Sequence, residues 1–144
     1  MAVKLANPDA DVACVPGERS IQMNIQELST CTQYNLPIKI INLNNGYLGM
    51  VKQWQDMQYG SRYSQSVYED SLPDFIKLVE AYGHVGMRVD KLEDLDAAME
   101  EAFKLKDRLV FMDIYVDRHE HVYPMQIAPN GSMRDMWLSK TERS

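Results

Sequence analysis

The sequence predicts an α/β domain of three layers (α/β/α), in which helices cover both faces of a mostly parallel β-sheet. Segments rich in β-branched residues alternate with segments of helical periodicity along residues 11–116. Neighbouring parallel strands need long crossover connections, which helices provide. The chain has 144 residues, of which 45% are hydrophobic and 25% charged, and this composition fits one globular domain with an ordinary core.

Four segments are predicted to be strands because each is short, apolar and bounded by turn residues. Pro16-Gly17 ends the first of them and Asn44-Asn45-Gly46 ends the second. The third and fourth strands are expected in the second half of the chain. The four predicted strands are residues 11–15, 38–43, 85–89 and 109–116.

Helices are predicted between these strands from apolar residues that recur every three or four positions. Ser20 is the expected N-cap of a helix over residues 21–34, and a second helix is expected over residues 47–57. Ser71-Leu72-Pro73-Asp74 and Asp90-Lys91-Leu92-Glu93 are capping-box patterns that predict two more helices, the first of which ends at Gly83. The polar residues 58–70 lack a clear period and are predicted to form a surface loop.

Charge and composition exclude several classes of function. The 15 Lys and Arg residues are outnumbered by 21 Asp and Glu residues and do not cluster, so nucleic acid is not expected as a partner. No apolar run approaches the roughly 20 residues that span a bilayer, and residues 1–10 lack the features of a signal peptide, so we expect a cytoplasmic protein with no membrane contact. Cys14 and Cys31 lie in apolar segments without CxxC spacing and are predicted to be buried, reduced thiols.

Two polar clusters directly follow predicted strands, and these are the candidate binding residues. They are Gly17-Glu18-Arg19-Ser20 and Asn44-Asn45-Gly46-Tyr47. Ligands of open parallel sheets bind beyond the carboxyl ends of the strands, and a helix N-terminus favours an anion such as phosphate. The alternative is that both clusters are ordinary turn and capping residues.

A longer resemblance favours the binding site. The two clusters are similar to the thiamine diphosphate motif, in which GDG precedes a strand that ends in NN. Four segments of the chain resemble the C-terminal domain of the catalytic large subunit of acetohydroxyacid synthase (acetolactate synthase), and the resemblance covers residues 6–144. The segments are SIQMNIQELSTC, LPIKIINLNNGYLGMVKQWQDMQYGSRYS, SLPDFIKLVEAYGHVGMRVDK and HVYPMQIAPNGSMRDMWLSKTER.

The resemblance implies the thiamine diphosphate-binding fold without its N-terminal part. Residues 1–116 would form the C-terminal part of that domain. Residues 117–144 would form a tail that folds over the active-site cleft, and the segment Pro129-Asn130-Gly131-Ser132 lies in that tail.

By resemblance, a Mg²⁺ ion would anchor the diphosphate. Glu18 stands where the family has its metal-binding Asp, Asn45 would supply a side-chain oxygen, and Tyr47 would supply its backbone carbonyl. Hard oxygen ligands of this kind suit Mg²⁺. The resemblance further implies that Trp54 contacts substrate, and the residue pattern alone favours a core stripe of Met50, Val51 and Trp54. The implied cofactor-binding residues are Gly17, Ser20, Asn45, Tyr47, Leu48, Gly49, Met50 and Val51.

The implied activity is the condensation of pyruvate with a second 2-keto acid, pyruvate or 2-ketobutyrate, with loss of CO₂ in branched-chain amino acid biosynthesis. FAD would bind the full-length enzyme and not this chain. The implied partners are the small-molecule 2-keto acids, the rest of the large subunit, a second copy in a homodimer, and a regulatory small subunit. No catalytic residue is expected within the 144 residues, so the chain alone is predicted to be inactive.

The sequence departs from the family motif at Glu18 and Arg19, where GDG is expected. Glu adds one methylene at a metal site that needs near-ideal geometry. Arg replaces a glycine whose lack of a side chain allows a close approach to the ligand, although a guanidinium also pairs with phosphate. The alternative function is therefore a non-catalytic interaction domain that keeps the fold and has lost metal and cofactor.

Two further groups of polar residues carry weaker expectations. His119-Glu120-His121 offers two imidazoles without a clear third ligand, so a solvated loop is favoured over a zinc site. Arg62 and Tyr63 would border the active-site entrance by resemblance, and their residue types alone indicate an exposed surface.

Overall fold

The computed structural model describes residues 1–126, 131–132 and 136–139. The chain forms two compact units. Unit 1 contains Met1–Tyr47 and Tyr68–Val116, and unit 2 contains Leu48–Val67 and Asp117–Ser144. Of the segment Pro129-Asn130-Gly131-Ser132, residues 129 and 130 lie outside the described residues, and the place of the tail over a cleft stays a prediction.

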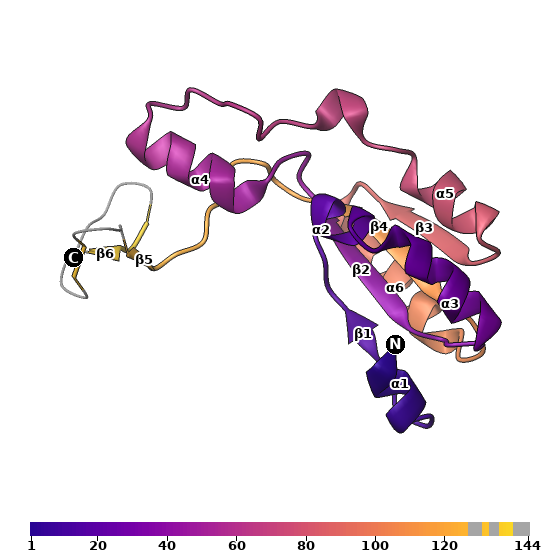
Figure 1. Cartoon of the computed structure of the whole chain (residues 1–144). Coiled ribbons are helices and arrows are strands. Elements are labelled where there is room, and N and C mark those ends of the chain that lie inside the picture. The colour runs from indigo at the N-terminus through magenta and orange to yellow at the C-terminus, as the bar shows by residue number, and fades with distance from the viewer. Residues whose placement is uncertain (127–130, 133–135, 140–144) are drawn as a thin grey trace. The chain divides into compact units, whose positions relative to one another are not determined.

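Unit 1 is built on a four-stranded sheet in the order β1-β2-β4-β3 (Figure 1). All neighbouring pairs in this sheet are parallel. The predicted strands are confirmed with small shifts at their ends. The observed strands are β1 (Ala13–Cys14), β2 (Lys39–Asn44), β3 (Val85–Val89) and β4 (Val110–Tyr115).

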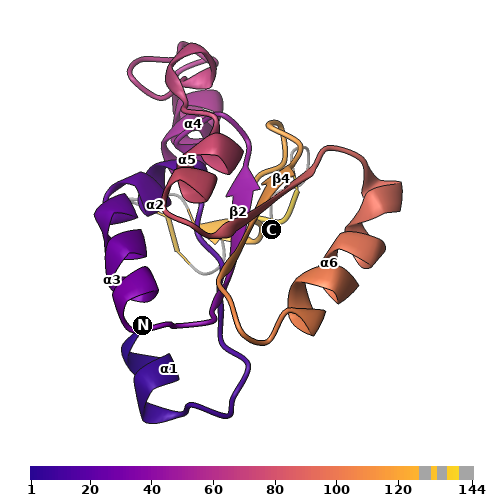
Figure 2. The same ribbon diagram turned by 90° about the vertical axis from the view of Figure 1, so that its right-hand side faces the viewer.

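Helices cover both faces of this sheet, which confirms the predicted three-layer α/β class. α3 (Leu28–Gln33) and α5 (Phe75–Ala81) lie on one face, and α6 (Leu95–Lys104) lies on the other (Figure 2). Unit 1 also contains α1 (Ala2–Ala6), α2 (Glu18–Gln22) and the 3₁₀ turns η1 (Ile25–Glu27), η2 (Glu69–Ser71) and η3 (Leu92–Asp94).

Unit 2 contains one longer helix and a small antiparallel pair of strands. They are α4 (Gly49–Gln58), β5 (Met125–Gln126) and β6 (Met136–Trp137). None of the described helices in either unit has the length and hydropathy needed to cross a membrane.

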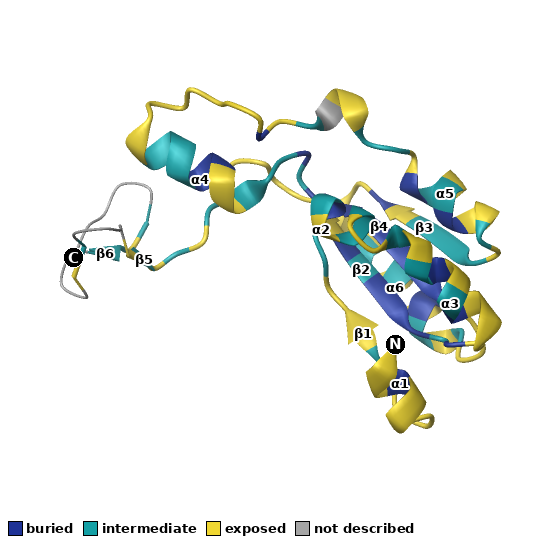
Figure 3. Ribbon diagram, in the orientation of Figure 1, coloured by how far each residue is buried: buried dark blue, intermediate teal, exposed yellow. Residues whose placement is uncertain are grey.

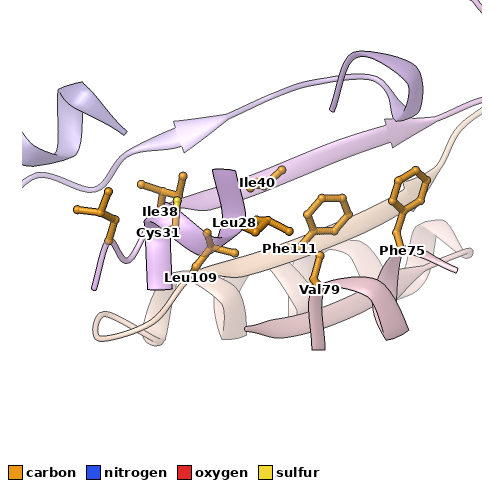
Figure 4. Packing of buried hydrophobic residues seen from close by; sticks show 9 residues of the cluster. Leu28, Cys31, Ile38, Ile40, Phe75, Val79, Leu109 and Phe111 are labelled. Carbon is orange, nitrogen blue, oxygen red and sulfur yellow. The ribbon is translucent and has the colours of Figure 1, made fainter. Parts of the chain in front are cut away.

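The pleat of the strands divides the apolar core of unit 1 into two clusters, because successive side chains point to opposite faces. Leu109 and Phe111 face α3 and α5, whereas Val110 and Met112 face α6. The rings of Phe75 and Phe111 stack with centroids 5.8 Å apart in the first cluster (Figure 4). Figure 3 shows the buried residues running along β2 at the centre of this unit.

A buried lysine begins β2. Lys39 is 1% exposed, and its Nζ donates hydrogen bonds to the carbonyl of Leu105 and, at 3.0 Å, to the carbonyl of Arg108. These carbonyls follow the C-terminus of α6, where a positive charge is favourable. Burial lowers the pKa of Lys39, and the nearby carboxylate of Asp11 opposes this effect. Lys39 therefore stabilises the end of the sheet opposite the carboxyl ends of the strands.

The single helix expected over residues 21–34 is wrong. The chain there forms α2, η1 and α3 in succession, because Asn24 takes a φ of −133° and a ψ of 24°, which lie outside the α-helical region. Ser20 is likewise not the N-cap. α2 begins at Glu18 with Gly17 as its N-cap, so Ser20 lies within the helix and is exposed.

The two capping boxes are also corrected. Asp74, not Ser71, caps α5, and its side chain accepts hydrogen bonds from the amides of Ile76 and Lys77. Asp90-Lys91-Leu92-Glu93 forms no side-chain cap and leads into η3. Leu92 in this turn is 82% exposed and does not pack on the sheet. Gly83, with φ of 85°, follows α5 as predicted.

The prediction for the two cysteines is half right. Both are free thiols, and Cys31 is buried between α3 and the sheet. Cys14 is exposed on β1, which lies at one edge of the sheet that the described residues form.

α5 approaches β3 closely at a glycine. A Cβ atom built on Gly86 would lie 2.8 Å from Cγ2 of Ile76 and 3.2 Å from its backbone Cα, which is closer than packed carbon atoms tolerate. The absence of a side chain at Gly86 therefore sets the distance between this helix and the sheet.

Replacing Gly86 with Ala is expected to lower the free energy of unfolding by about 1–3 kcal/mol, because the added methyl overpacks the interface of α5 and β3. Urea unfolding followed by far-ultraviolet circular dichroism measures this change. Gly17→Ala is the matched control, since its Cβ would meet only the Leu43 carbonyl at 3.8 Å, and we expect a change below about 1 kcal/mol there. Equal effects of the two substitutions would contradict the packing argument.

Candidate functional site

The two predicted polar clusters meet at the carboxyl ends of β1 and β2. The chain beyond β1 stays paired with β2, since the amide of Leu43 donates to the carbonyl of Pro16 at 2.9 Å and Gly17 forms a parallel bridge with Leu43. α2 then begins at Glu18. The structure thus brings Glu18 to the end of the strand that carries Asn44 and Asn45.

The residues after β2 form a tight turn, which we call the NNGY turn (Asn44–Tyr47). The Gly46 amide donates to Asn44 Oδ1 at 3.2 Å, and the Tyr47 amide donates to Asn45 Oδ1 at 2.9 Å. Gly46 takes a φ of 74°, which a glycine adopts without strain. Its carbonyl accepts a hydrogen bond from the Tyr68 amide at 2.9 Å, where the chain re-enters unit 1.

The carboxylate of Glu18 is buried against this turn. Glu18 is 2% exposed, and among the described residues its Oε1 atom has no hydrogen-bond partner. Burial raises the pKa of Glu18 above its ordinary value, and the negative charge of Asp113 adds to this. Hydrogen bonds from the backbone amides of Glu18, Asn45 and Tyr47 oppose the increase. The carboxylate therefore lies beside the other two predicted metal ligands.

The donor set fits a hard divalent cation. Glu18 offers a carboxylate oxygen, Asn45 an amide oxygen with a second lone pair, and Tyr47 a backbone carbonyl, and Mg²⁺ prefers such ligands. A buried carboxylate oxygen without a partner is costly, and a cation would remove that cost. Within the described ranges no group of three His, Cys, Asp or Glu residues could hold a metal, so a site here depends on mixed oxygen donors.

Arg19 points to a different partner from Glu18. Its guanidinium carbon lies 3.6 Å from the centroid of the Tyr68 ring, a cation-π contact within unit 1. Tyr68 is itself hydrogen-bonded to Gly46, so the Arg19 side chain reaches the segment beside the NNGY turn. The arginine that replaces the family's glycine is thus held by an aromatic ring in this structure.

The sequence analysis missed Asp113, a fully buried carboxylate on β4 that belongs to this site. Asn42 and Asn44 both donate hydrogen bonds to it. The sequence does contain a signal for this pair. Asp113 is the one charged residue in the apolar segment LVFMDIYV, and Asn42 is a polar residue in the segment IKIINL. Polar residues in such runs need a buried partner.

The remaining predicted site residues belong to unit 2. Leu48 and Gly49 lead into α4, and Met50, Val51 and Trp54 lie on that helix. Met50 is 46% and Val51 42% exposed, so the alternative that they form a core stripe is wrong for these two residues. Trp54 is half-buried. Their roles toward cofactor and substrate stay predictions.

Unit 2 is organised by the carboxylate of Asp56 on α4. It accepts hydrogen bonds from Lys52 at 2.6 Å, from the Tyr63 hydroxyl and from Nε2 of His121 at 2.8 Å. Burial alone would raise the pKa of Asp56, but these hydrogen bonds outweigh it and hold the pKa well below its usual range. The solvated loop predicted for His119-Glu120-His121 is therefore wrong at His121 and correct at the exposed His119.

Comparison with known proteins agrees with the geometry of unit 1. Residues 1–114 match the family described as thiamine pyrophosphate enzyme, C-terminal TPP binding domain. The chain belongs to this family. Thiamine pyrophosphate is the same compound as thiamine diphosphate, so the resemblance seen in the motifs is confirmed.

Relatives with assigned functions extend the match to the whole chain. The acetolactate synthase isozyme 3 large subunit of Escherichia coli is 58% identical over 146 aligned residues, which cover 100% of this chain and 25% of that protein. The acetolactate synthase large subunit of Haemophilus influenzae is 58% identical over 142 residues, 99% of this chain and 24% of that protein. The chain therefore spans about a quarter of the length of these relatives.

A solved structure shows the same fold. The thiamine diphosphate-dependent 4-hydroxybenzoylformate decarboxylase of Rhodococcus jostii RHA1 superposes with a TM-score of 0.70 and 28% sequence identity. The match covers 79% of this chain and 21% of that chain. The parallel sheet of unit 1 is thus the sheet of a thiamine pyrophosphate-binding domain.

Asp56→Asn is expected to lower the stability of unit 2 at pH 7 by about 1–3 kcal/mol, because it removes the charge that Lys52 and His121 contact. The lowered pKa of Asp56 gives a stabilisation that is present above the ordinary carboxyl pKa of about 3.9 and is lost as pH falls through the folded-state value. The difference between variant and parent should therefore shrink below about pH 4.

Tryptophan fluorescence during urea unfolding measures this effect, since Trp54 and Trp137, the two tryptophans of the chain, belong to unit 2. Asp9→Asn removes an exposed carboxylate and is the control, with little change expected at either pH. A stability difference for Asp56→Asn that stayed constant between pH 7 and pH 3 would count against the assigned ion pairs.

Proposed function

We propose that this chain is the cofactor-binding C-terminal part of an acetolactate synthase large subunit, which joins pyruvate to a second 2-keto acid with loss of CO₂. The observation that carries the proposal is the convergence of Glu18, Asn45 and Tyr47 at one edge of the sheet, in a chain 58% identical along its whole length to such subunits. The second 2-keto acid would be pyruvate or 2-ketobutyrate, and the products would lead to branched-chain amino acids.

In this proposal the residues of unit 1 hold and orient the cofactor. Bound thiamine diphosphate supplies a thiazolium ring that stabilises the negative charge left when CO₂ departs. Glu18, Asn45 and the Tyr47 carbonyl would hold Mg²⁺, which neutralises the diphosphate. Gly17 presents backbone without a side chain beside this position, as close approach of a ligand requires.

The residues on α4 would serve the substrate side. Met50 and Val51 expose apolar side chains from the first turn of this helix, which suits contact with an uncharged ring or a small alkyl group. Trp54 follows one turn later on the same helix and would contact the second 2-keto acid.

The full-length enzyme would be cytoplasmic, would hold FAD outside this chain, and would assemble as a homodimer with a regulatory small subunit. The 144-residue chain would not turn over alone, because it spans about a quarter of the length of the large subunits that it resembles.

A second candidate is a non-catalytic interaction domain that keeps the fold without metal or cofactor. The observation in its favour is the Arg19 guanidinium, which stacks on Tyr68 where the family has a glycine. A bulky side chain in that position would restrict the approach of the diphosphate. Binding measurements on the two altered motif positions separate the candidates.

We expect Mg²⁺ with thiamine diphosphate to bind the chain in isothermal titration calorimetry, and Glu18→Gln to weaken binding by at least about tenfold, because the carboxylate charge is lost. Glu18→Asp combined with Arg19→Gly should bind at least as tightly as the parent chain. Asp9→Asn, which removes a remote carboxylate, is the matched control and should bind like the parent.

Binding by the double variant and not by the parent chain would support the interaction domain, because the altered motif would then disable the site. Absence of binding in both would contradict a cofactor site in this chain.

A further inference from the structure

Asp113 lies at the centre of the polar end of the sheet. It is 0% exposed and stands opposite Asn42 in the parallel register of β2 and β4. Its Oδ1 atom accepts hydrogen bonds from Nδ2 of Asn42 at 2.9 Å and from Nδ2 of Asn44 at 3.1 Å. One carboxylate oxygen thus holds the side-chain amides of two residues of β2.

This contact fixes which way the Asn44 side chain faces. A carboxylate only accepts hydrogen bonds, so the amide nitrogen of Asn44 has to point toward Asp113. Its Oδ1 atom then points away and accepts the Gly46 amide at 3.2 Å. If Asn44 were reversed, an amide nitrogen would face the Gly46 N–H and an oxygen would face Asp113, and both contacts would be lost.

The orientation of Asn44 in turn shapes the NNGY turn. The hydrogen bond from Gly46 to Asn44 closes the first half of the turn, and the hydrogen bond from Tyr47 to Asn45 closes the second. The side-chain oxygen of Asn45 and the carbonyl of Tyr47 are the two metal donors that this turn supplies. The positions of these two donors therefore depend on the hydrogen bond between Asn44 and Asp113, which lies where the turn leaves β2.

We propose that Asp113 is a positioning residue for the metal-binding turn: through Asn44 it orders Gly46 and thereby holds Asn45 and Tyr47 beside Glu18. Its effect on the metal rests on the proposed function, whereas its effect on the turn does not. Asp113 itself is assigned no contact with cofactor or substrate.

Stability alone does not account for Asp113. The neighbouring buried positions of β4 carry apolar residues such as Phe111 and Met112, and an apolar side chain in a fully buried position is commonly as stabilising as a charged one. Among the described residues its Oδ2 atom has no hydrogen-bond partner. The burial of the Asp113 carboxylate is explained by its role toward Asn44, to which it offers only hydrogen-bond acceptors.

The experiment is amide hydrogen exchange on the full 144-residue chain, measured residue by residue by nuclear magnetic resonance. Asp113→Leu keeps roughly the size of the side chain and removes the oxygen that accepts from Asn42 and Asn44. We expect exchange of the Gly46 amide to become about tenfold faster, the factor that corresponds to one hydrogen bond of ordinary net strength. Exchange of strand amides at Ile41 and Phe111 should change far less.

The double variant Asn44→Asp, Asp113→Asn is the rescue. It places the carboxylate on residue 44, where it accepts from Gly46, and the amide on residue 113. Nδ2 of residue 113 then takes the position of Oδ1 and donates to residue 44. It also donates to Asn42 once the Asn42 amide is reversed, which gives Asn42 Oδ1, without a partner among the described residues, a donor. Protection of Gly46 should return to within about twofold of the parent chain. Asn44→Asp alone sets two carboxylates against each other and should expose Gly46 at least as much as Asp113→Leu.

Lys39→Met is the control for a general loss of stability. It removes a buried charge at the opposite end of β2, with no contact to the turn. We expect it to speed exchange throughout the sheet without a selective effect on Gly46. If Asp113→Leu does not fold, Asp113→Ala removes the same acceptor and is measured in its place.

Unchanged protection of Gly46 in Asp113→Leu, or in Asp113→Ala where that variant is used, would overturn the proposal. A loss of protection spread evenly over the sheet, or a failure of the double variant to restore Gly46, would also overturn it. Mg²⁺ with thiamine diphosphate is then titrated into the same variants, with binding expected to weaken about tenfold and to recover in the double variant. If the parent chain binds no Mg²⁺ and cofactor, the proposed function fails while the exchange result still decides the role of Asp113.

Discussion

The parallel pairing of β2 with β4 is the constraint on which the rest of this structure depends. It sets Ile40 opposite Phe111 and, two residues further along, Asn42 opposite Asp113. Because side chains two apart point to the same face, the strand pair that buries the apolar core also carries the polar residues at its carboxyl end. A slip of one residue would turn the asparagines toward α6 and apolar side chains toward Glu18. Core and site therefore share one register.

The two departures from the family motif have separate structural consequences. Consecutive residues of a helix point about 100° apart, so Glu18 and Arg19 in the first turn of α2 face different surroundings. Glu18 turns inward to the NNGY turn and the sheet, where its added methylene is buried. Arg19 turns toward Tyr68. The longer acid thus stays beside the NNGY turn, whereas the arginine changes what covers the turn.

The sequence was most informative where structure depends on nearby residues. β3 was predicted to the residue because an apolar run bounded by Gly83 and Asp90 has few other conformations. The helix over residues 21–34 was wrong because its apolar spacing continues through Asn24, whose backbone angle breaks the helix. The residues proposed to hold the metal were found from a motif. Asp113 and His121 were not, since their partners lie more than 60 positions away and only the folded chain brings them together.

The point where the chain leaves unit 1 and the point where it returns are neighbours. Tyr68 re-enters beside Gly46, joined to it by a backbone hydrogen bond of 2.9 Å. Residues 48–67 are therefore attached as an insertion whose two ends meet, and a segment of this kind can change in length or composition without moving the strands that carry it. Evolution can therefore vary residues 48–67 while the sheet and the NNGY turn of unit 1 stay the same.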